Sequence, residues 1–202
     1  MLLGDWSDAT PDVAATYDDA GRVLTLGNGV STLSYSYNDA NELMSETQDI
    51  QSPVDLPAKT VAYTYDADGN RAGMTYPDGF AVGYGYNERN LLANVTAGGP
   101  PPLVTYLYDA AGLPLLKTLE NGTSASYAFD AAARLMGIDH RMGGVSFQKF
   151  GYALDTAGLR TAREESNAGF PPVTDAYDHD AADQLSKVRR TECQTSAKSL
   201  TE

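Results

Sequence analysis

The sequence predicts an all-β fold in which tandem β-hairpins form an antiparallel sheet, and three observations support this prediction. Twelve of the 13 tyrosines fall on one pattern, aromatic-x-aromatic-Asp/Asn-x-x-Gly/Asn, which restarts about every 20 to 28 residues. The 19 glycines are typical of a chain with many short turns. No window shows a sustained apolar stripe with helical period, so we expect at most one or two helical turns, between Ala181 and Arg190.

Eight copies of the pattern follow one another, and the outermost copies are the least regular. Their defining residues are Tyr17, Asp18 and Gly21; Tyr35, Tyr37 and Asn38; Tyr63, Tyr65, Asp66 and Gly69; Tyr84, Tyr86 and Asn87; Tyr106, Tyr108, Asp109 and Gly112; Tyr127, Phe129 and Asp130; Tyr152, Asp155 and Gly158; and the looser string Tyr177-Asp178-His179-Asp180. We therefore expect a lead-in over residues 1–12, a repeat array over 13–190 and a polar, disordered tail over 191–202.

Each copy predicts a strand, a tight turn and a second strand, in that order. Tyrosines two residues apart, such as Tyr63 and Tyr65, project from one face of an extended strand, where we expect their rings to stack. The Asp or Asn that follows can bond the backbone two residues on, and the Gly three residues later accepts a positive φ. A short alternating run, such as residues 115–119, then predicts the second strand.

A second kind of turn closes each unit and leads to the next copy. The turn-forming strings are Asn28-Gly29, Pro77-Asp78-Gly79, Gly98-Gly99, Asn121-Gly122 and Gly143-Gly144. Three proline-containing stretches, residues 46–60, 97–103 and 166–172, lengthen the spacing between copies. Because insertions in repeat folds collect in loops at one rim, we expect these stretches to be exposed loops.

At residues 63–71 the string Tyr-x-Tyr-Asp-x-x-Gly-Asn-Arg, followed by Thr75-Tyr76-Pro77-Asp78-Gly79, resembles the YD repeat of RHS proteins, the bacterial relatives of the teneurin shell. The resemblance covers residues 13–190. It implies hairpins whose sheet spirals into an arc of a hollow cocoon, which in bacterial toxins encloses a C-terminal effector. The family's self-cleavage motif, Asp-Pro-x-Gly-Leu, is not matched, because the nearest string, at residues 155–159, lacks the proline.

This resemblance implies a structural function without catalysis. The chain would be a segment of an RHS/YD-repeat shell that encloses a polymorphic toxin or other cargo, in a secreted or cell-surface protein. Its partners would be the remainder of the shell or an encapsulated effector. We expect a fragment, because neither end shows the atypical cap that protects a repeat array. The alternative is a cell-surface repeat module that binds a glycan or a protein through exposed tyrosines.

Charge and composition limit the partners. A net charge of −13 disfavours nucleic acid and anionic membranes, since both require clustered Lys and Arg. The first residues lack the basic and apolar regions of a signal peptide, so export uses another route or the true N-terminus lies upstream. No run approaches the ~18 apolar residues of a membrane span. Cys193 is the single cysteine, so no intrachain disulfide can form.

Residues that could carry chemistry have structural explanations, and we expect no catalytic site, cofactor or metal. Residues 66–70 have the carboxylate spacing of a calcium loop, but Pro77 stands where an EF-hand places its bidentate Glu. Gly27-Asn28-Gly29 is interpreted as a hairpin turn, since no further phosphate-loop residues follow. His140 and His179 are too few to suggest a metal site, and no Gly-x-Ser-x-Gly string marks a catalytic serine.

Overall fold

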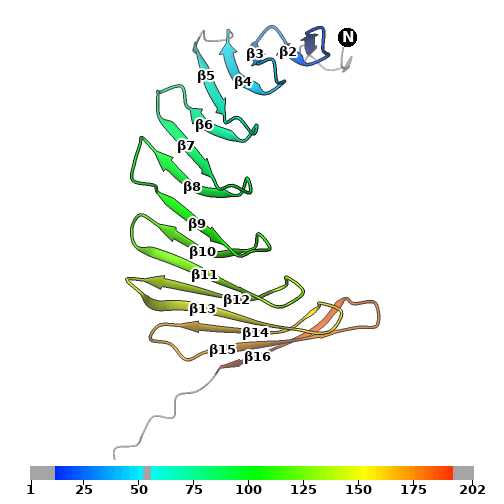
Figure 1. Ribbon diagram of the computed structural model, residues 1–202. Coiled ribbons are helices and arrows are strands. Elements are labelled where there is room, and N and C mark those ends of the chain that lie inside the picture. Colours follow the sequence, from blue (N-terminus) through cyan, green and yellow to red (C-terminus); the bar gives the residue numbers. More distant parts are fainter. Residues whose placement is uncertain (1–11, 52–55, 193–202) are drawn as a thin grey trace, which may run out of the picture. The chain divides into compact units, whose positions relative to one another are not determined.

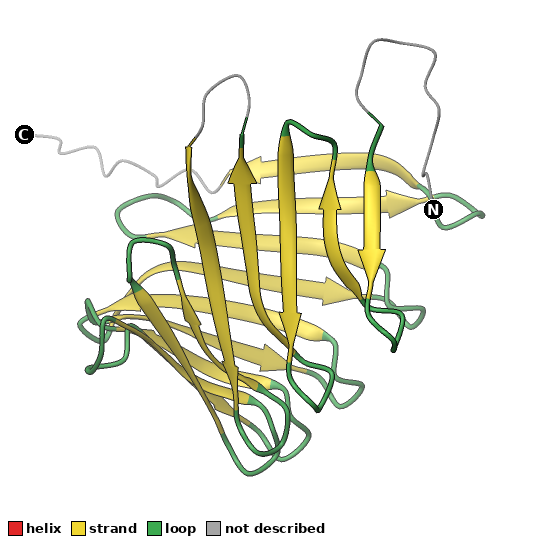
Figure 2. Ribbon diagram, turned by 90° about the horizontal axis from the view of Figure 1, so that it is seen from above, coloured by secondary structure: helices red, strands yellow, loops and turns green. Residues whose placement is uncertain are grey.

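The computed structural model describes residues 12–51 and 56–192, and every regular element in these residues is a β-strand (Figure 1, Figure 2). The chain divides into two compact units, Met1–Pro102 and Leu103–Glu202. The described strands of the first unit are β1 (Ala14–Tyr17), β2 (Val23–Gly27), β3 (Ser31–Tyr37), β4 (Leu43–Ile50), β5 (Leu56–Tyr65), β6 (Arg71–Thr75), β7 (Ala81–Tyr86) and β8 (Leu92–Ala97). Those of the second unit are β9 (Val104–Tyr108), β10 (Pro114–Leu119), β11 (Thr123–Phe129), β12 (Leu135–Met142), β13 (Val145–Leu154), β14 (Arg160–Asn167), β15 (Val173–His179) and β16 (Leu185–Glu192).

Strand order in the sheet follows the order of the sequence. Within each unit, consecutive strands pair antiparallel, so that each strand between the first and the last pairs with the one before it and the one after it (Figure 1). Short turns connect the strands, as antiparallel pairing permits. The predicted fold of tandem β-hairpins in an antiparallel sheet is therefore confirmed.

The helical turns expected between Ala181 and Arg190 were a wrong prediction. Residues 180–184 form a tight turn, and β16 begins directly afterwards at Leu185. β16 pairs with β15 along its length, and it includes Thr191 and Glu192, which we had expected in the tail. Cross-strand pairing outweighs the weak local preference of this segment for helix. The rest of the expected tail, residues 193–202, lies outside the described residues.

One of the stretches that lengthen the repeat spacing, residues 46–60, consists mainly of extended strands and not of a loop. β4 continues to Ile50 and β5 begins at Leu56, with Thr47 opposite Thr60 and their hydroxyl oxygens 2.8 Å apart. β-branched residues favour this extended conformation, so this hairpin grows longer where we expected an insertion at a rim. β14 ends at Asn167, and residues 98–103 and 168–172 do form loops, in agreement with the prediction.

The pairing register gives each unit two chemically different faces. Residues directly opposite each other in neighbouring strands share a face of the sheet, and alternate residues of a strand share it too. The face that carries the first tyrosine of each copy, here named the tyrosine face, includes Tyr63, Met74, Val82, Tyr84 and Val95 in β5–β8. The opposite face of the same strands carries Thr64, Gly73, Gly83 and Thr96.

Little of either unit is fully buried. Among the described residues only Tyr63, Ala125 and Asp175 are buried, with exposed fractions of 9%, 7% and 3%. Side chains in an uncovered sheet are shielded only by their neighbours in the same layer, so most apolar residues stay half-buried. Stability must therefore come largely from backbone pairing, turns and links between neighbouring strands.

Candidate functional site

All eight copies of the repeat form the same turn. The backbone N–H of the Asp or Asn donates to the carbonyl four residues later, and the residue three positions on donates back to the carbonyl of that Asp or Asn. The side-chain Oδ1 of the Asp or Asn accepts a hydrogen bond of 2.9 to 3.1 Å from the N–H four residues later. This short polar side chain thus satisfies the backbone groups that a tight turn leaves unpaired.

The residue three positions after the Asp or Asn always has a positive φ, between 58° and 90°. These residues are Gly21, Asn41, Gly69, Asn90, Gly112, Ala133, Gly158 and Asp183. Glycine and asparagine tolerate this left-handed conformation well, whereas alanine does not. The sequence pattern assigned no turn residue to Ala133 and treated the copy with Asp183 as a looser one, but the position of both residues relative to the turn Asp would have identified them.

In three of the turns the side chain four residues after the turn Asp or Asn links that turn to the next. The links are Arg22 Nη1 to Asn41 Oδ1 at 2.7 Å, Asn70 Nδ2 to Asn90 Oδ1 at 3.0 Å, and Arg134 Nη1 to the Asp155 carbonyl at 3.0 Å. Both arginines also bond the Asp of their own turn, Asp18 or Asp130, through Nε. Sequence reasoning missed these links.

Hydrogen bonds in three of the turns hold the pKa of the turn carboxyl, Asp18, Asp66 or Asp130, below the ordinary range. For Asp18 and Asp130 the main cause is the backbone N–H four residues later, with the arginine side chain adding to it. For Asp66 the main cause is the side-chain amide of Asn70. Each of these hydrogen bonds favours the ionised carboxylate, so the turns are best stabilised when these residues carry their charge.

In three copies the second tyrosine is bonded to the preceding copy. Its hydroxyl donates to the carbonyl of the first residue in a strand of that copy. The three bonds are Tyr37 to Val23 at 3.1 Å, Tyr65 to Leu43 at 2.9 Å and Tyr86 to Arg71 at 3.1 Å. The last three copies carry Phe129, Leu154 and His179 in this position, and none of these side chains has a phenolic hydroxyl.

The expected stacking of tyrosines two residues apart occurs at Tyr106 and Tyr108, whose ring centroids lie 6.5 Å apart at an interplanar angle of 25°. In the described part of the chain, Tyr63 and Tyr65 form no such ring pair. Their hydroxyls bind different partners, Glu46 Oε1 at 2.8 Å and the Leu43 carbonyl at 2.9 Å. Both partners belong to β4, but they lie three residues apart, so the two rings reach different points of that strand and stacking is not general.

Tyr63 is the most enclosed tyrosine, and its surroundings are charged. Its hydroxyl bonds Glu46, and the Arg71 guanidinium lies 5.7 Å from the Tyr63 ring centroid and 5.3 Å from that of Tyr84. Burial, followed by the bond to Glu46, raises the pKa of the Tyr63 hydroxyl. The Tyr63 hydroxyl therefore acts as a hydrogen-bond donor between β5 and β4.

An ion-pair network joins the last three strands on the tyrosine face. Asp175 of β15 receives two bonds from Arg190 of β16, at 2.8 and 3.0 Å, and lies 3.0 Å from Arg163 of β14. Arg163 also pairs with Glu165 at 3.1 Å. Hydrogen bonds from Arg190 hold the pKa of Asp175 below its usual range. Both carboxylates are thus engaged by guanidinium groups, which suits a clamp between strands better than proton transfer.

The other candidates from the sequence lie in structural positions. Asp66 Oδ1 accepts from the backbone of Asp68 and Asn70, so this carboxylate serves its turn. Over residues 12–51 and 56–192, no three His, Cys, Asp or Glu side chains are placed to hold a metal ion. The His140 ring packs 6.1 Å from that of Phe147. No helix in the described chain is long and apolar enough to cross a membrane.

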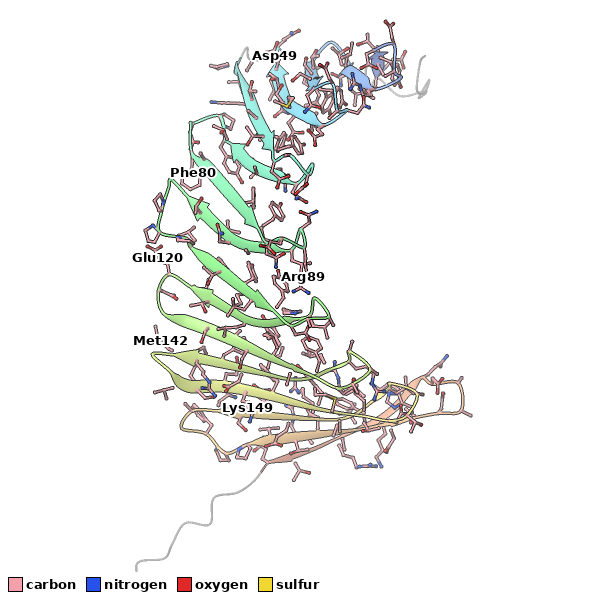
Figure 3. The ribbon with its side chains drawn as sticks, viewed as in Figure 1. Asp49, Phe80, Arg89, Glu120, Met142 and Lys149 are labelled. Carbon is pink, nitrogen blue, oxygen red and sulfur yellow. The ribbon has the colours of Figure 1, made fainter. Side chains whose placement is uncertain are left out.

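The tyrosine outside the repeat pattern, Tyr76, borders an open hollow in the first unit. The hollow measures about 550 Å³ and is lined by Lys59, Tyr76, Pro77, Asp78, Phe80 and Val82. Tyr76 and Phe80 are 40% and 48% exposed, and their ring centroids lie 6.2 Å apart. Figure 3 shows Phe80 at the turn before β7, at the opposite end of that strand from Arg89. Sequence reasoning had treated this turn only as a connection.

Comparison with solved structures identifies proteins that share this fold. The chain matches the crystal structure of TcdB2-TccC3-Cdc42 with a TM-score of 0.73 and 17% identity, over 87% of this chain and 10% of that one. It matches TcdB2-TccC3 with a TM-score of 0.61 and 12% identity, over 91% and 16%. It matches a Tc holotoxin pore of Photorhabdus luminescens with a TM-score of 0.51 and 12% identity, over 91% of this chain and 15% of that one. No protein-family profile and no curated protein sequence matches the chain.

These comparisons confirm the RHS-type fold that the YD pattern implied, at the level of fold. At 12 to 17% identity the likeness concerns the path of the backbone and not particular side chains. The chain spans between 10 and 16% of the length of the structures that it matches.

Proposed function

We propose that this chain is a non-catalytic structural segment of a larger RHS/YD-repeat shell, and that the shell encloses a toxin or other cargo. The observation that carries the proposal is the agreement of 87% of the chain with one tenth of TcdB2-TccC3-Cdc42. A segment that repeats one hairpin and bonds only to its neighbours is suited to extending a wall. Its partners are the remainder of the shell or the enclosed effector, and its location is outside the cell or at its surface.

The contacts of the repeat-defining residues support a structural role. The turn carboxylates bond their own backbone, and Tyr37, Tyr65 and Tyr86 bond the preceding copy. Groups that are hydrogen-bonded in this way hold the strands in register, and the same hydrogen bonds are not free for a substrate. The hydroxyls of Tyr37, Tyr65 and Tyr86 are thus not free to bind a ligand, which argues against a binding role for these three tyrosines.

The test of containment uses the complete gene product that includes these residues. Electron microscopy should show a hollow shell with enclosed density, and a protease added to the intact particle should leave the enclosed polypeptide uncut. The same polypeptide should be digested once the shell is unfolded. An open, extended array whose other segments are cut at the same rate before and after unfolding would contradict the proposal.

A second candidate function, binding of a glycan or a protein at the surface, is favoured by one observation. The hollow beside Tyr76 and Phe80 exposes two aromatic rings, as recognition sites for apolar or sugar ligands commonly do. A glycan array and a surface-protein pull-down, each with the wild-type chain and with Tyr76→Ala, test this function. Loss of a bound ligand in Tyr76→Ala but not in Tyr86→Phe would support it, and an absence of ligands for the wild type would exclude it.

A further inference from the structure

The chain contains two Asn-Gly turns, and they differ in the hydrogen bonds that control cyclisation of the asparagine side chain. Asn28-Gly29 connects β2 to β3, and Asn121-Gly122 connects β10 to β11. In both turns the glycine is exposed and has a positive φ, 79° in Gly29 and 81° in Gly122. Every other Asn in the described chain is followed by a residue with a side chain, which shields the backbone nitrogen.

At Asn28 two backbone N–H groups converge on the side-chain oxygen. Those of Val30 and Ser31 each donate to Oδ1 at 3.1 Å. They polarise the carboxamide carbonyl and face the oxygen on which negative charge develops when the carbon is attacked. The backbone N–H of Gly29, the attacking group, donates no hydrogen bond within the described residues. For cyclisation, the Asn28 carboxamide carbon is therefore polarised and the Gly29 nitrogen is not held by a hydrogen bond to the part of the chain that the structure describes.

At Asn121 the attacking backbone nitrogen and the side-chain carboxamide are less favourably placed for cyclisation. The Gly122 N–H donates to the Leu119 carbonyl at 3.0 Å, so the nucleophile is already engaged in the turn. Only one backbone group, the N–H of Thr123, donates to Asn121 Oδ1, also at 3.0 Å. The two turns thus form an internal comparison in which the dipeptide is the same and the hydrogen bonding differs.

We infer that Asn28 is a site of spontaneous, structure-assisted deamidation in the folded protein. The Gly29 nitrogen loses its proton to solvent and forms a bond to Asn28 Cγ. The bond from Cγ to Nδ2 breaks, and the side-chain nitrogen takes a proton from solvent and leaves as ammonia. The resulting succinimide ring is opened by water at either carbonyl. The product is aspartate or isoaspartate at position 28, and no oxidant or reductant takes part.

The modification changes the β2–β3 connection in two ways. Each product carries one more negative charge than asparagine, in a chain whose net charge is already −13. Isoaspartate also inserts one additional carbon into the backbone of a turn where the Asn28 N–H bonds the Ser31 carbonyl at 3.2 Å. The lengthened connection no longer fits this bond, so pairing of β2 with β3 should loosen from the turn end.

The test is peptide mapping by mass spectrometry of the full chain, held at 37 °C and neutral pH for several weeks. Deamidated and isoaspartyl forms are quantified at positions 28 and 121, both in the folded protein and in a sample denatured by urea. The denatured sample gives the intrinsic ratio of the two rates, because both dipeptides are Asn-Gly. The Asn28→Gln variant identifies the signal from position 28, since a six-membered ring closes more slowly.

In the folded protein we expect Asn28 to convert about three to ten times faster than Asn121, because Gly122 must first break its hydrogen bond. In the denatured chain the two rates should be nearly equal. A folded-state ratio above the denatured ratio supports the inference. A folded-state ratio at or below the denatured ratio overturns it, because the hydrogen bonds at Asn28 would then not assist the reaction.

Discussion

Substitution of Ala133 by glycine tests whether the turns require a positive φ at the residue three positions after the turn Asp or Asn. Ala133 has a φ of 61°, in the position that glycine or asparagine occupies in six of the eight turns. An L-residue other than glycine loses roughly 1–2 kcal/mol in this left-handed region. Glycine removes that strain, but it raises the entropy of the unfolded chain, which destabilises the protein by about 0.4–1 kcal/mol.

The neighbouring substitution Ala132→Gly supplies the matched control. Ala132 lies in the same turn, is exposed like Ala133 and does not have a positive φ. Both variants raise the unfolded-state entropy equally, so this contribution cancels in a comparison of the two. The free energy of unfolding of Ala133→Gly should therefore exceed that of Ala132→Gly by about 1–2 kcal/mol.

The measurement is urea unfolding or thermal melting of both variants beside the wild-type chain. For a chain of this length the difference corresponds to roughly 2–8 °C in Tm. Ala132→Gly should melt below the wild type and Ala133→Gly at or above it. Equal destabilisation by both substitutions would show that Ala133 is not held in the left-handed conformation, and the account of the turn would fail.

Further predictions concern links between copies and the charge of the turns. Tyr86→Phe should lower the free energy of unfolding by about 0.5–1.5 kcal/mol through loss of the bond to the Arg71 carbonyl, whereas Tyr84→Phe in the same strand should change it little; equal effects in urea titrations would refute this. Arg134→Gln should lower Tm through loss of the bond to the Asp155 carbonyl. Arg134→Leu should lower Tm less, because leucine occupies the equivalent position in three other turns, at Leu91, Leu113 and Leu159. A lower Tm for Arg134→Leu than for Arg134→Gln would argue against this account of the position. Because the folded pKa of Asp18, Asp66 and Asp130 lies below the reference value of 3.8, their stabilisation is present above about pH 4 and is lost as the pH falls through the folded pKa. Asp130→Asn, which can accept the same backbone bonds as Asn38 and Asn87, should make the melting temperature less sensitive to acid below about pH 4, and an unchanged acid dependence would contradict the role given to this carboxylate.

The repeat turn could be predicted from the sequence because its hydrogen bonds join residues at most four positions apart. Asp18 alone, for example, bonds the N–H groups of Ala20 and Arg22. The bond from Tyr65 to Leu43 spans 22 residues, and no local pattern indicates which carbonyl the hydroxyl will find. The error at residues 181–190 has a similar origin, since the strand there depends on pairing with β15.

The candidate site showed the same limit. The aromatic and acidic residues of the repeat were evident from their spacing, but their partners were not. The contacts of Asp175 require β14, β15 and β16 to lie side by side, and sequence separation alone does not set the register of Arg163 and Arg190. The hollow beside Tyr76 was missed because the turn residues Pro77 and Asp78 had a sufficient structural explanation.

The ion-pair network of Asp175 bears on how the chain yields to mechanical force. The last hairpins lack the tyrosine hydroxyl that bonds neighbouring copies in the first unit, and Arg163, Asp175 and Arg190 hold the last three strands together instead. Salt weakens the attraction between charges where a partner is open to solvent, as Arg190 is with its side chain 60% exposed, although its partner Asp175 is buried. A hydroxyl-to-carbonyl bond is largely indifferent to salt. When the chain is pulled from its C-terminal end in an optical trap, the force that detaches β16 should therefore fall as salt rises, while hairpins of the first unit should open at nearly constant force.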